Sequence, residues 1–249
     1  MATSDQLGRF VWRDLVTPDV ERAKAFYGQL FGWAYDAMPM PGGGTYWVVR
    51  SGGQMIGGVM ATPPGSPAPP SWTSYVSVAD VDASCRAFVE RGARALVEPK
   101  DIPGGGRFAV IQDPEGAVLG LLRSGGEGQP ASRPPAGTFC WETLSARDPA
   151  RAKAFYRSLL GWNPATGPGG EAVFATAAGI QVADLQAARN GPASWVTYVA
   201  VDDVAASRSK ASELGGRVVV PLVEIPKVGK MALIADPAGA VLALFQPGA

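Results

Sequence analysis

The pattern of apolar and polar positions along the chain alternates between two periods. Short apolar runs such as Phe10–Val16 and Trp72–Val78 are bounded by turn residues, which is typical of β-strands. After each run, apolar residues recur every three or four positions, as Ala23, Phe26 and Tyr27 do. That spacing predicts an amphipathic helix lying on a core. The chain is therefore expected to alternate strands with helices.

The first predicted helix is bounded by residues that begin and end helices. Thr17 is expected to cap its free amides, and Gly32 is expected to end it. The segment Arg22–Tyr27 recurs 129 residues later as Arg151–Tyr156. Asp148 opens that second copy, so the chain carries one unit twice.

The repeat extends to four modules, each with a strand, a helix and three further strands. The modules span about 8–60, 70–124, 137–187 and 192–247. Beyond the opening strand of each module, we assign strands at Thr45–Arg50, Gln54–Met60, 95–97, Arg107–Gln112, Ala117–Leu122, near Val173 and Gln181, and three more at the end of the chain.

The segment 125–136 is rich in Gly, Pro and Ser, which predicts a linker. The expected domains are therefore 1–124 and 137–249, two modules in each. The predicted fold class is α+β, with four βαβββ modules paired into two half-barrel domains.

Composition narrows the class of partner. The chain has 249 residues and 22 residues of each charge sign, and no basic run of the kind that binds nucleic acid or a membrane surface. No apolar run is long enough to span a membrane, so a cytoplasmic protein is expected. Cys85 and Cys140 are expected to be reduced thiols. The expected partner is a small molecule, bound by a monomer or a homodimer.

Two motifs appear in order in each half: a helix reading D-x-x-R-A-x-x-F-Y with G-W at its end, and a closing D-P-x-G-A-V-L turn and strand. With the four modules, they resemble the vicinal oxygen chelate superfamily. That superfamily groups glyoxalase I, bleomycin-type resistance proteins, fosfomycin-modifying enzymes and extradiol dioxygenases. The resemblance implies that two modules curl into one U-shaped sheet whose concave side holds the ligand.

The resemblance also implies where a metal would bind, with a His on the first strand of each module and a Glu on the closing strand. Counting from the Asp that opens each helix, and from the Asp of each D-P-x-G turn, these places hold Trp12, Thr73, Trp141, Val196, Gly120 and Ala243. None of these is a good metal ligand, and the chain contains no His. We predict no metal and no cofactor. An oxygen-only Mg²⁺ or Ca²⁺ site using Asp184 stays as an alternative.

Strand alternation selects the side chains that share a face with these places. The expected ligand-binding residues are Trp12, Asp14, Thr73, Tyr75, Trp141, Thr143 and Tyr198, with Ser77 and Val196 on the same face. Arg107 and Lys230, at equivalent places 123 residues apart, could hold an acidic ligand at the mouth. The alternatives are that the aromatic side chains are core and that the two cations are solvated ends of strands.

Two functions from different classes remain open. The first is a metal-independent protein that binds or sequesters an apolar or aromatic small molecule, as bleomycin-type resistance proteins do in the superfamily that this chain resembles. The second is a glyoxalase-like enzyme of lyase, isomerase or cyclase type that acts without metal, using Asp14, Glu142 or a Tyr as acid or base. The absence of good metal ligands at the six positions where the superfamily binds its metal favours the first function.

Overall fold

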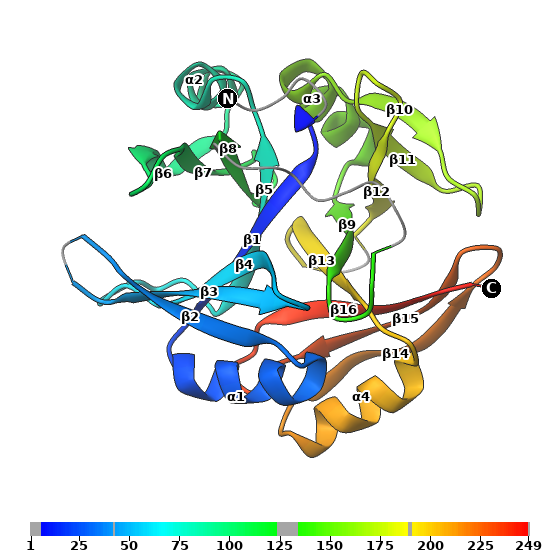
Figure 1. Cartoon of the computed structure of the whole chain (residues 1–249). Coiled ribbons are helices and arrows are strands. Elements are labelled where there is room, and N and C mark those ends of the chain that lie inside the picture. The colour runs from blue at the N-terminus through cyan, green and yellow to red at the C-terminus, as the bar shows by residue number, and fades with distance from the viewer. Residues whose placement is uncertain (1–5, 42, 124–133, 189–190, 249) are drawn as a thin grey trace. The chain divides into compact units, whose positions relative to one another are not determined.

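The computed structural model describes residues 6–41, 43–123, 134–188 and 191–248, and these form two eight-stranded mixed sheets and four helices (Figure 1). The first sheet has the order β2-β3-β4-β1-β5-β8-β7-β6 and the second β10-β11-β12-β9-β13-β16-β15-β14. The strands of the first sheet are β1 (Phe10–Thr17), β2 (Ala34–Pro39), β3 (Thr45–Ser51), β4 (Gln54–Ala61), β5 (Ser71–Ser77), β6 (Arg94–Asp101), β7 (Arg107–Gln112) and β8 (Val118–Arg123). Those of the second are β9 (Phe139–Ala146), β10 (Asn163–Thr166), β11 (Ala172–Ala175), β12 (Gln181–Ala187), β13 (Ser194–Ala200), β14 (Arg217–Ile225), β15 (Gly229–Ala235) and β16 (Val241–Pro247). The predicted α+β class with four βαβββ modules is confirmed.

Each module contributes one helix: α1 (Val20–Phe31), α2 (Val81–Glu90), α3 (Pro149–Leu160) and α4 (Val204–Glu213). The prediction that Thr17 caps α1 is wrong. Asp19 is the cap, and its carboxylate accepts the backbone N–H of Arg22 at 3.0 Å. A short acidic side chain at this position meets both the free amides and the positive end of the helix dipole. Gly32 ends the helix in the left-handed conformation, as predicted.

Two strands were missed by the sequence assignment, namely β2 and β10. Most residues of both are exposed, and β10 has only four residues. An outer strand with both faces near solvent lacks the apolar alternation on which the assignment depends. The three strands after each helix are therefore present in every module, although only two were assigned in the first and third.

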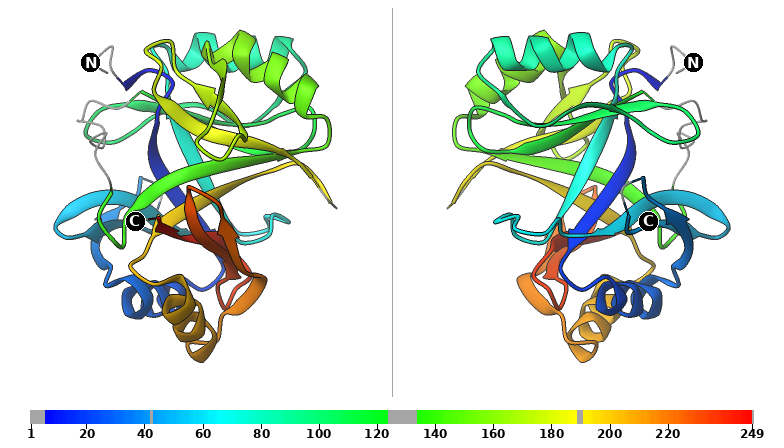
Figure 2. Two further views of the ribbon diagram at one scale, coloured as in Figure 1. Left: turned by 90° about the vertical axis from the view of Figure 1, so that its right-hand side faces the viewer. Right: turned by 90° about the vertical axis from the view of Figure 1, so that its left-hand side faces the viewer.

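Packing groups the modules differently from the sheets. One compact unit contains the second and third modules with the start of β1, and the other contains the first and fourth. The boundaries fall inside the four central strands, between Trp12 and Arg13, Thr73 and Ser74, Trp141 and Glu142, and Trp195 and Val196. In the first unit α2 contacts α3, and in the second α1 contacts α4, which can be followed in Figures 1 and 2. The predicted linker lies largely outside the described residues.

The repeated Phe-Tyr motif holds the second unit together. The hydroxyl of Tyr27 on α1 donates to the carboxylate of Asp236, in the turn before β16, at 3.1 Å, and the indole of Trp72 donates to the Tyr27 oxygen at 3.0 Å. Burial, and then the neighbouring Asp236 charge, raises the pKa of Tyr27 well above its usual value. The tyrosine therefore stays neutral and ties the first module to the fourth.

The first unit repeats this tie with the equivalent residues. Tyr156 donates to Asp113 at 2.8 Å, and Trp195 donates to Tyr156 at 3.1 Å. Burial and then Asp113 raise the pKa of Tyr156 in the same direction. The second and third modules are thus joined by the same tyrosine–aspartate hydrogen bond as the first and fourth, and in both units an indole donates to that tyrosine.

The tryptophans that follow the helix-ending glycines are also structural. Trp33 is 4% exposed and donates its indole N–H to the Gly137 carbonyl, and Trp162 is fully buried and donates to the Gly8 carbonyl. Each indole stacks on the tyrosine of its own unit. Both tryptophans are therefore packing residues of the two units.

Candidate functional site

Each sheet has one face toward the helices and one face away from them, and strand alternation separates the two. On β16, Leu242 and Leu244 belong to the core under α4, whereas Ala243 and Phe245 lie on the opposite face. We call the face away from the helix of a module its open face. It is the face on which a ligand could be bound without disturbing the helical core.

The open face of the second sheet carries an apolar cluster of its own, which we call the apolar patch. Its buried members are Tyr198, Met231 and Ala243, and its half-buried members are Cys140, Trp141, Val196, Ile225, Leu233 and Phe245. All of these residues belong to one compact unit. The sequence prediction that Trp141, Val196 and Tyr198 share a face is confirmed.

In each module, one residue of the first strand lies directly beside one residue of the last strand on the open face. We call these the ladder pairs: Asp14 with Gly58, Tyr75 with Gly120, Thr143 with Asp184, and Tyr198 with Ala243. The next residues in each register, such as Leu15 beside Val59, belong to the helical cores. The pairs therefore occupy equivalent positions in all four modules, and Tyr75 rather than Thr73 lies beside Gly120.

The first pair holds a buried carboxylate. Asp14 is 7% exposed and accepts a hydrogen bond at 2.6 Å from the hydroxyl of Tyr46, on β3. The same phenol covers Gly58, since a Cβ there would lie 2.0 Å from the Tyr46 oxygen. Tyr46 was missed by the sequence analysis. The signal that could have found it is the pair Gly57 and Gly58 inside a strand, because strand glycines mark the close approach of another group.

The third pair holds its carboxylate on the other strand. The hydroxyl of Thr143 on β9 donates to Asp184 on β12 at 2.5 Å. Thr143 is buried and Asp184 is half-buried. The first and third modules therefore each have one acid on the open face that accepts a hydroxyl hydrogen, but the acid comes from opposite strands.

The two remaining pairs are tyrosines over small residues. Tyr75 is 6% exposed and contacts Phe108 edge to face, with ring centroids 6.3 Å apart. Tyr198 is 8% exposed and instead contacts Phe245, at 6.4 Å. Edge-to-face geometry is a favoured arrangement for aromatic pairs.

The other predicted ligand contacts are dispersed. Trp12 and Trp141 are half-buried, whereas Thr73 is 8% exposed. Lys230 is exposed on β15, opposite Glu224 and Gln246 in the ladder. The structure thus brings Trp141 and Tyr198 together in the apolar patch and leaves Lys230 outside it.

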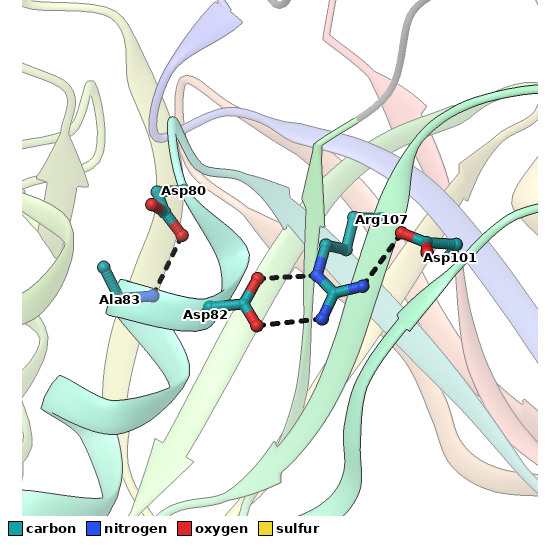
Figure 3. Close-up of polar contacts among 5 residues, drawn as sticks. All are labelled: Asp80, Asp82, Ala83, Asp101 and Arg107. Atoms are coloured by element: carbon teal, nitrogen blue, oxygen red, sulfur yellow. Dashed lines mark hydrogen bonds and ion pairs between the residues drawn. The ribbon is translucent and has the colours of Figure 1, made fainter.

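Arg107 is engaged by two carboxylates of its own module (Figure 3). Its Nε and Nη2 atoms donate to the two oxygens of Asp82 at 2.5 and 2.8 Å, and Nη1 donates to Asp101 at 2.8 Å. The hydrogen bonds that Arg107 donates to Asp82 lower the pKa of Asp82 below its usual value and raise the pKa of Arg107. Two of its donors therefore tie the start of β7 to the first turn of α2, and a third ties it to the end of β6.

The donor set does not fit a metal ion of the kind bound by imidazole and carboxylate. The chain has no His, and each ladder pair contributes at most one carboxylate. Within the described ranges, no group of three or more His, Cys, Asp or Glu side chains gathers. Divalent metals in proteins need three or four such ligands, so no reaction step is assigned to a metal here.

Two family models cover most of the chain. One described as Glyoxalase/Bleomycin resistance protein/Dioxygenase superfamily matches residues 6–121, and one described as Glyoxalase-like domain matches residues 141–245. "Putative glyoxylase CFP32" of Mycobacterium tuberculosis is 35% identical over 95% of this chain and 94% of its own. The chain belongs to the glyoxalase/bleomycin resistance/dioxygenase superfamily. The resemblance seen in the motifs is therefore confirmed.

Other proteins resemble the chain over most of its length. "Anthracycline biosynthesis protein DnrV" of Streptomyces peucetius is 32% identical over 96% of this chain and 93% of its own. Among solved structures, the Mn(II)-bound glyoxalase from Novosphingobium aromaticivorans has a TM-score of 0.65 at 13% identity, covering 97% of this chain and 82% of that one. The 2,3-dioxygenase LapB from Pseudomonas sp. KL28 has a TM-score of 0.64 at 12% identity, covering 98% and 94%. At these identities the structures establish the fold alone.

Within the part of the chain that the structure describes, no helix is both long and apolar enough to cross a bilayer.

Proposed function

We propose that this glyoxalase-superfamily chain binds or sequesters an apolar or aromatic small molecule on an open sheet face, without a metal ion. The observation that carries the proposal is the apolar patch. Its half-buried side chains face away from the helical cores, so the packing of the cores does not account for them. Side chains that line small-molecule sites are typically apolar or aromatic, with a few polar groups.

The chemistry of the patch favours a planar ligand. Trp141 offers an indole face and Phe245 a phenyl face, and aromatic pairs contribute about 0.5 to 1.5 kcal/mol beyond the area that they bury. Tyr198 adds a phenol that can orient a polar group of the ligand. An aromatic ring system with one or two polar substituents fits this set of side chains.

The case for metal independence rests on the donor set. The similar structures include a Mn(II)-bound glyoxalase, but the ladder pairs here supply tyrosines, glycines, an alanine, a threonine and two separate carboxylates. Phenols and hydroxyls without carboxylate or imidazole partners hold divalent cations weakly. Binding by burial and stacking requires none of the missing ligands.

The relatives' names point to two chemistries, a glyoxylase and anthracycline biosynthesis. Anthracyclines are fused-ring aromatic compounds, and for this chain we favour the aromatic class because the patch is apolar. The name of a relative does not identify the ligand of this chain, so the ligand has to be found by screening.

The test is a binding screen on chelator-treated protein. Tryptophan fluorescence should report saturable binding of at least one planar aromatic compound from a panel that includes an anthracycline and the neutral dye N-phenylnaphthylamine, with about one site per chain. Treatment with EDTA should leave the affinity unchanged. Binding that appears only after a divalent metal is restored, or no binding across the panel, would overturn the proposal.

A metal-free enzyme is the second candidate, and the buried pair of Asp14 and Tyr46 is the observation that favours it. A carboxylate that accepts a phenol hydrogen at 2.6 Å can share a proton with a bound substrate. Mass spectrometry separates the two candidates: a sequestering protein returns its ligand unchanged, whereas an enzyme converts it and loses that conversion in Asp14→Asn.

A further inference from the structure

The two sheets differ at equivalent ladder pairs, and the difference lies in the smallest residues. Gly120 on β8 becomes Ala243 on β16, 123 residues later, while the tyrosine beside it is kept as Tyr75 and Tyr198. One methyl group beside a retained ring changes how much space the ring can occupy.

In the second module, the ring of Tyr75 lies directly on the strand. A Cβ at Gly120 would be only 2.1 Å from ring atom Cδ1, 2.4 Å from Cγ and 2.5 Å from Cε1. Real Cβ atoms do not approach carbon that closely, so this position of the ring requires glycine. Tyr75 therefore fills the open face above its ladder pair.

The first module is filled in the same way by a different residue. Tyr46 reaches across from β3 and places its phenol oxygen and Cζ where a side chain of Gly58 would be, at 2.0 and 2.1 Å from that Cβ. Its hydroxyl is fixed there by Asp14. Both ladder pairs of the first sheet thus combine a glycine with a tyrosine that covers it.

Neither arrangement is repeated in the second sheet. Asp184 stands at the place of Gly58, and Ala243 stands at the place of Gly120, so both positions carry side chains. The aromatic partner of the tyrosine also changes strand. Met231 stands at the place of Phe108 on the first sheet, and Phe245 stands at the place of Leu122. Tyr198 contacts Phe245 edge to face and belongs to the apolar patch.

We infer that the ligand is bound by the second sheet alone, on the apolar patch, and that the first sheet has been closed by its own tyrosines. Gly58 and Gly120 are the residues that permit the closure. This inference rests on the proposed function and adds to it the half of the chain that binds and the residues that decide which half it is.

The chain offers a matched pair of variants for the test. Trp12 and Trp141 are equivalent, half-buried residues of the two sheets, and each can be changed to Phe in the full chain. With N-phenylnaphthylamine as the probe, Trp141→Phe should raise the dissociation constant about two- to tenfold, because a stacking indole is reduced to a phenyl ring. Trp12→Phe should leave the constant within about twofold. An equal or larger effect of Trp12→Phe would overturn the inference.

A second readout places the probe without relying on tryptophan. Cys140 is the half-buried thiol of the patch, whereas Cys85 is 3% exposed, so Cys85→Ser leaves one thiol to follow. Saturating N-phenylnaphthylamine should slow the reaction of Cys140 with a thiol reagent severalfold. An unchanged rate, at a concentration where fluorescence shows the dye bound, would overturn the assignment to the second sheet.

The two proposals fail differently in these experiments. If the parent chain binds no compound of the panel, the proposed function fails and this inference fails with it. If the parent binds the dye but Trp141→Phe has no effect and Cys140 is not protected, the proposed function stands and only the assignment to the second sheet is lost. Circular dichroism and melting temperature should match the parent in each variant, which excludes unfolding as the cause.

Discussion

Two sets of equivalent residues behave oppositely across the internal repeat. The ties between modules are copied without change, with Tyr27, Trp72 and Asp236 in one unit matched by Tyr156, Trp195 and Asp113 in the other. The ladder pairs are not copied. Asp14 becomes Thr143, and Gly120 becomes Ala243.

This difference separates scaffold from site. A buried hydroxyl, indole and carboxylate that satisfy one another tolerate little change, since removing one partner leaves a buried polar group unpaired. The open face has no such constraint, so its residues can diverge and give the two sheets different roles. We therefore expect equivalent changes in the scaffold to have equal effects in the two units, and equivalent changes on the open faces to have different effects.

The largest expected loss of stability comes from removing the indoles that stack on Tyr27 and Tyr156. Trp33→Ala and Trp162→Ala each remove a buried indole that stacks on tyrosine and donates to a backbone carbonyl. Each should lower the free energy of unfolding by about 3 to 5 kcal/mol. Denaturant unfolding measures both, and costs that differ by more than about 2 kcal/mol would contradict a symmetric scaffold.

The next effect should be asymmetric. Gly120→Ala places a Cβ against the ring of Tyr75 and should cost about 2 to 3 kcal/mol, because the ring must leave a well-packed position. The reverse change, Ala243→Gly, should cost only about 1 kcal/mol, the usual penalty of glycine in a strand. Thermal unfolding of the two variants checks this order, and an equal cost would mean that Gly120 is not required by Tyr75.

A smaller effect is expected for Tyr27→Phe and Tyr156→Phe, about 1 to 2 kcal/mol each at neutral pH, since each removes one hydrogen bond to a buried carboxylate.

The same two variants test how the stability of the protein depends on pH. Burial raises the pKa of both tyrosines in the folded protein, so the stability that their neutral form contributes is fully present below about pH 10, the unfolded value. It is lost as the pH rises above that value, by about 1.4 kcal/mol per pH unit for each tyrosine. Between pH 9 and 11, the free energy of unfolding should therefore decrease less steeply with pH in the Phe variants than in the parent. Tyr35, whose pKa burial also raises, is present in all of them and sets the common baseline. Parallel curves would show that the hydroxyls ionise freely.

The smallest effect on stability should come from the partly exposed ion pairs of Arg107. Arg107→Ala loses its contacts with Asp82 and Asp101 but should lower the melting temperature by no more than about 2 °C, and less in high salt. Lys230→Ala, the equivalent change in the second sheet, serves as the control and should be neutral. A larger loss of ligand binding than of stability in Arg107→Ala would restore this residue to the site.

Most of the scaffold could be predicted from the sequence because its residues occur in both halves of the chain. Phe26, Tyr27 and Trp33 recur with their spacing, and the D-P-x-G turns recur with them, so the modules could be found from one chain. The outer strands β2 and β10 escaped because they bury few residues and show no alternation. The site was only partly predictable. Alternation placed Trp141 and Tyr198 on one face, but Tyr46 reaches Asp14 from a strand 32 residues away, which no local pattern reveals.

A titration of chelator-stripped protein with Mn²⁺ tests most directly whether this member of the superfamily works without a metal ion, as we propose. The ion bound by a similar structure is the right probe, because a retained site would accept it. We predict no saturable binding by calorimetry, an unchanged melting temperature and an unchanged affinity for the aromatic probe. Stoichiometric binding of Mn²⁺, with a rise in melting temperature and tighter binding of the probe, would contradict the account.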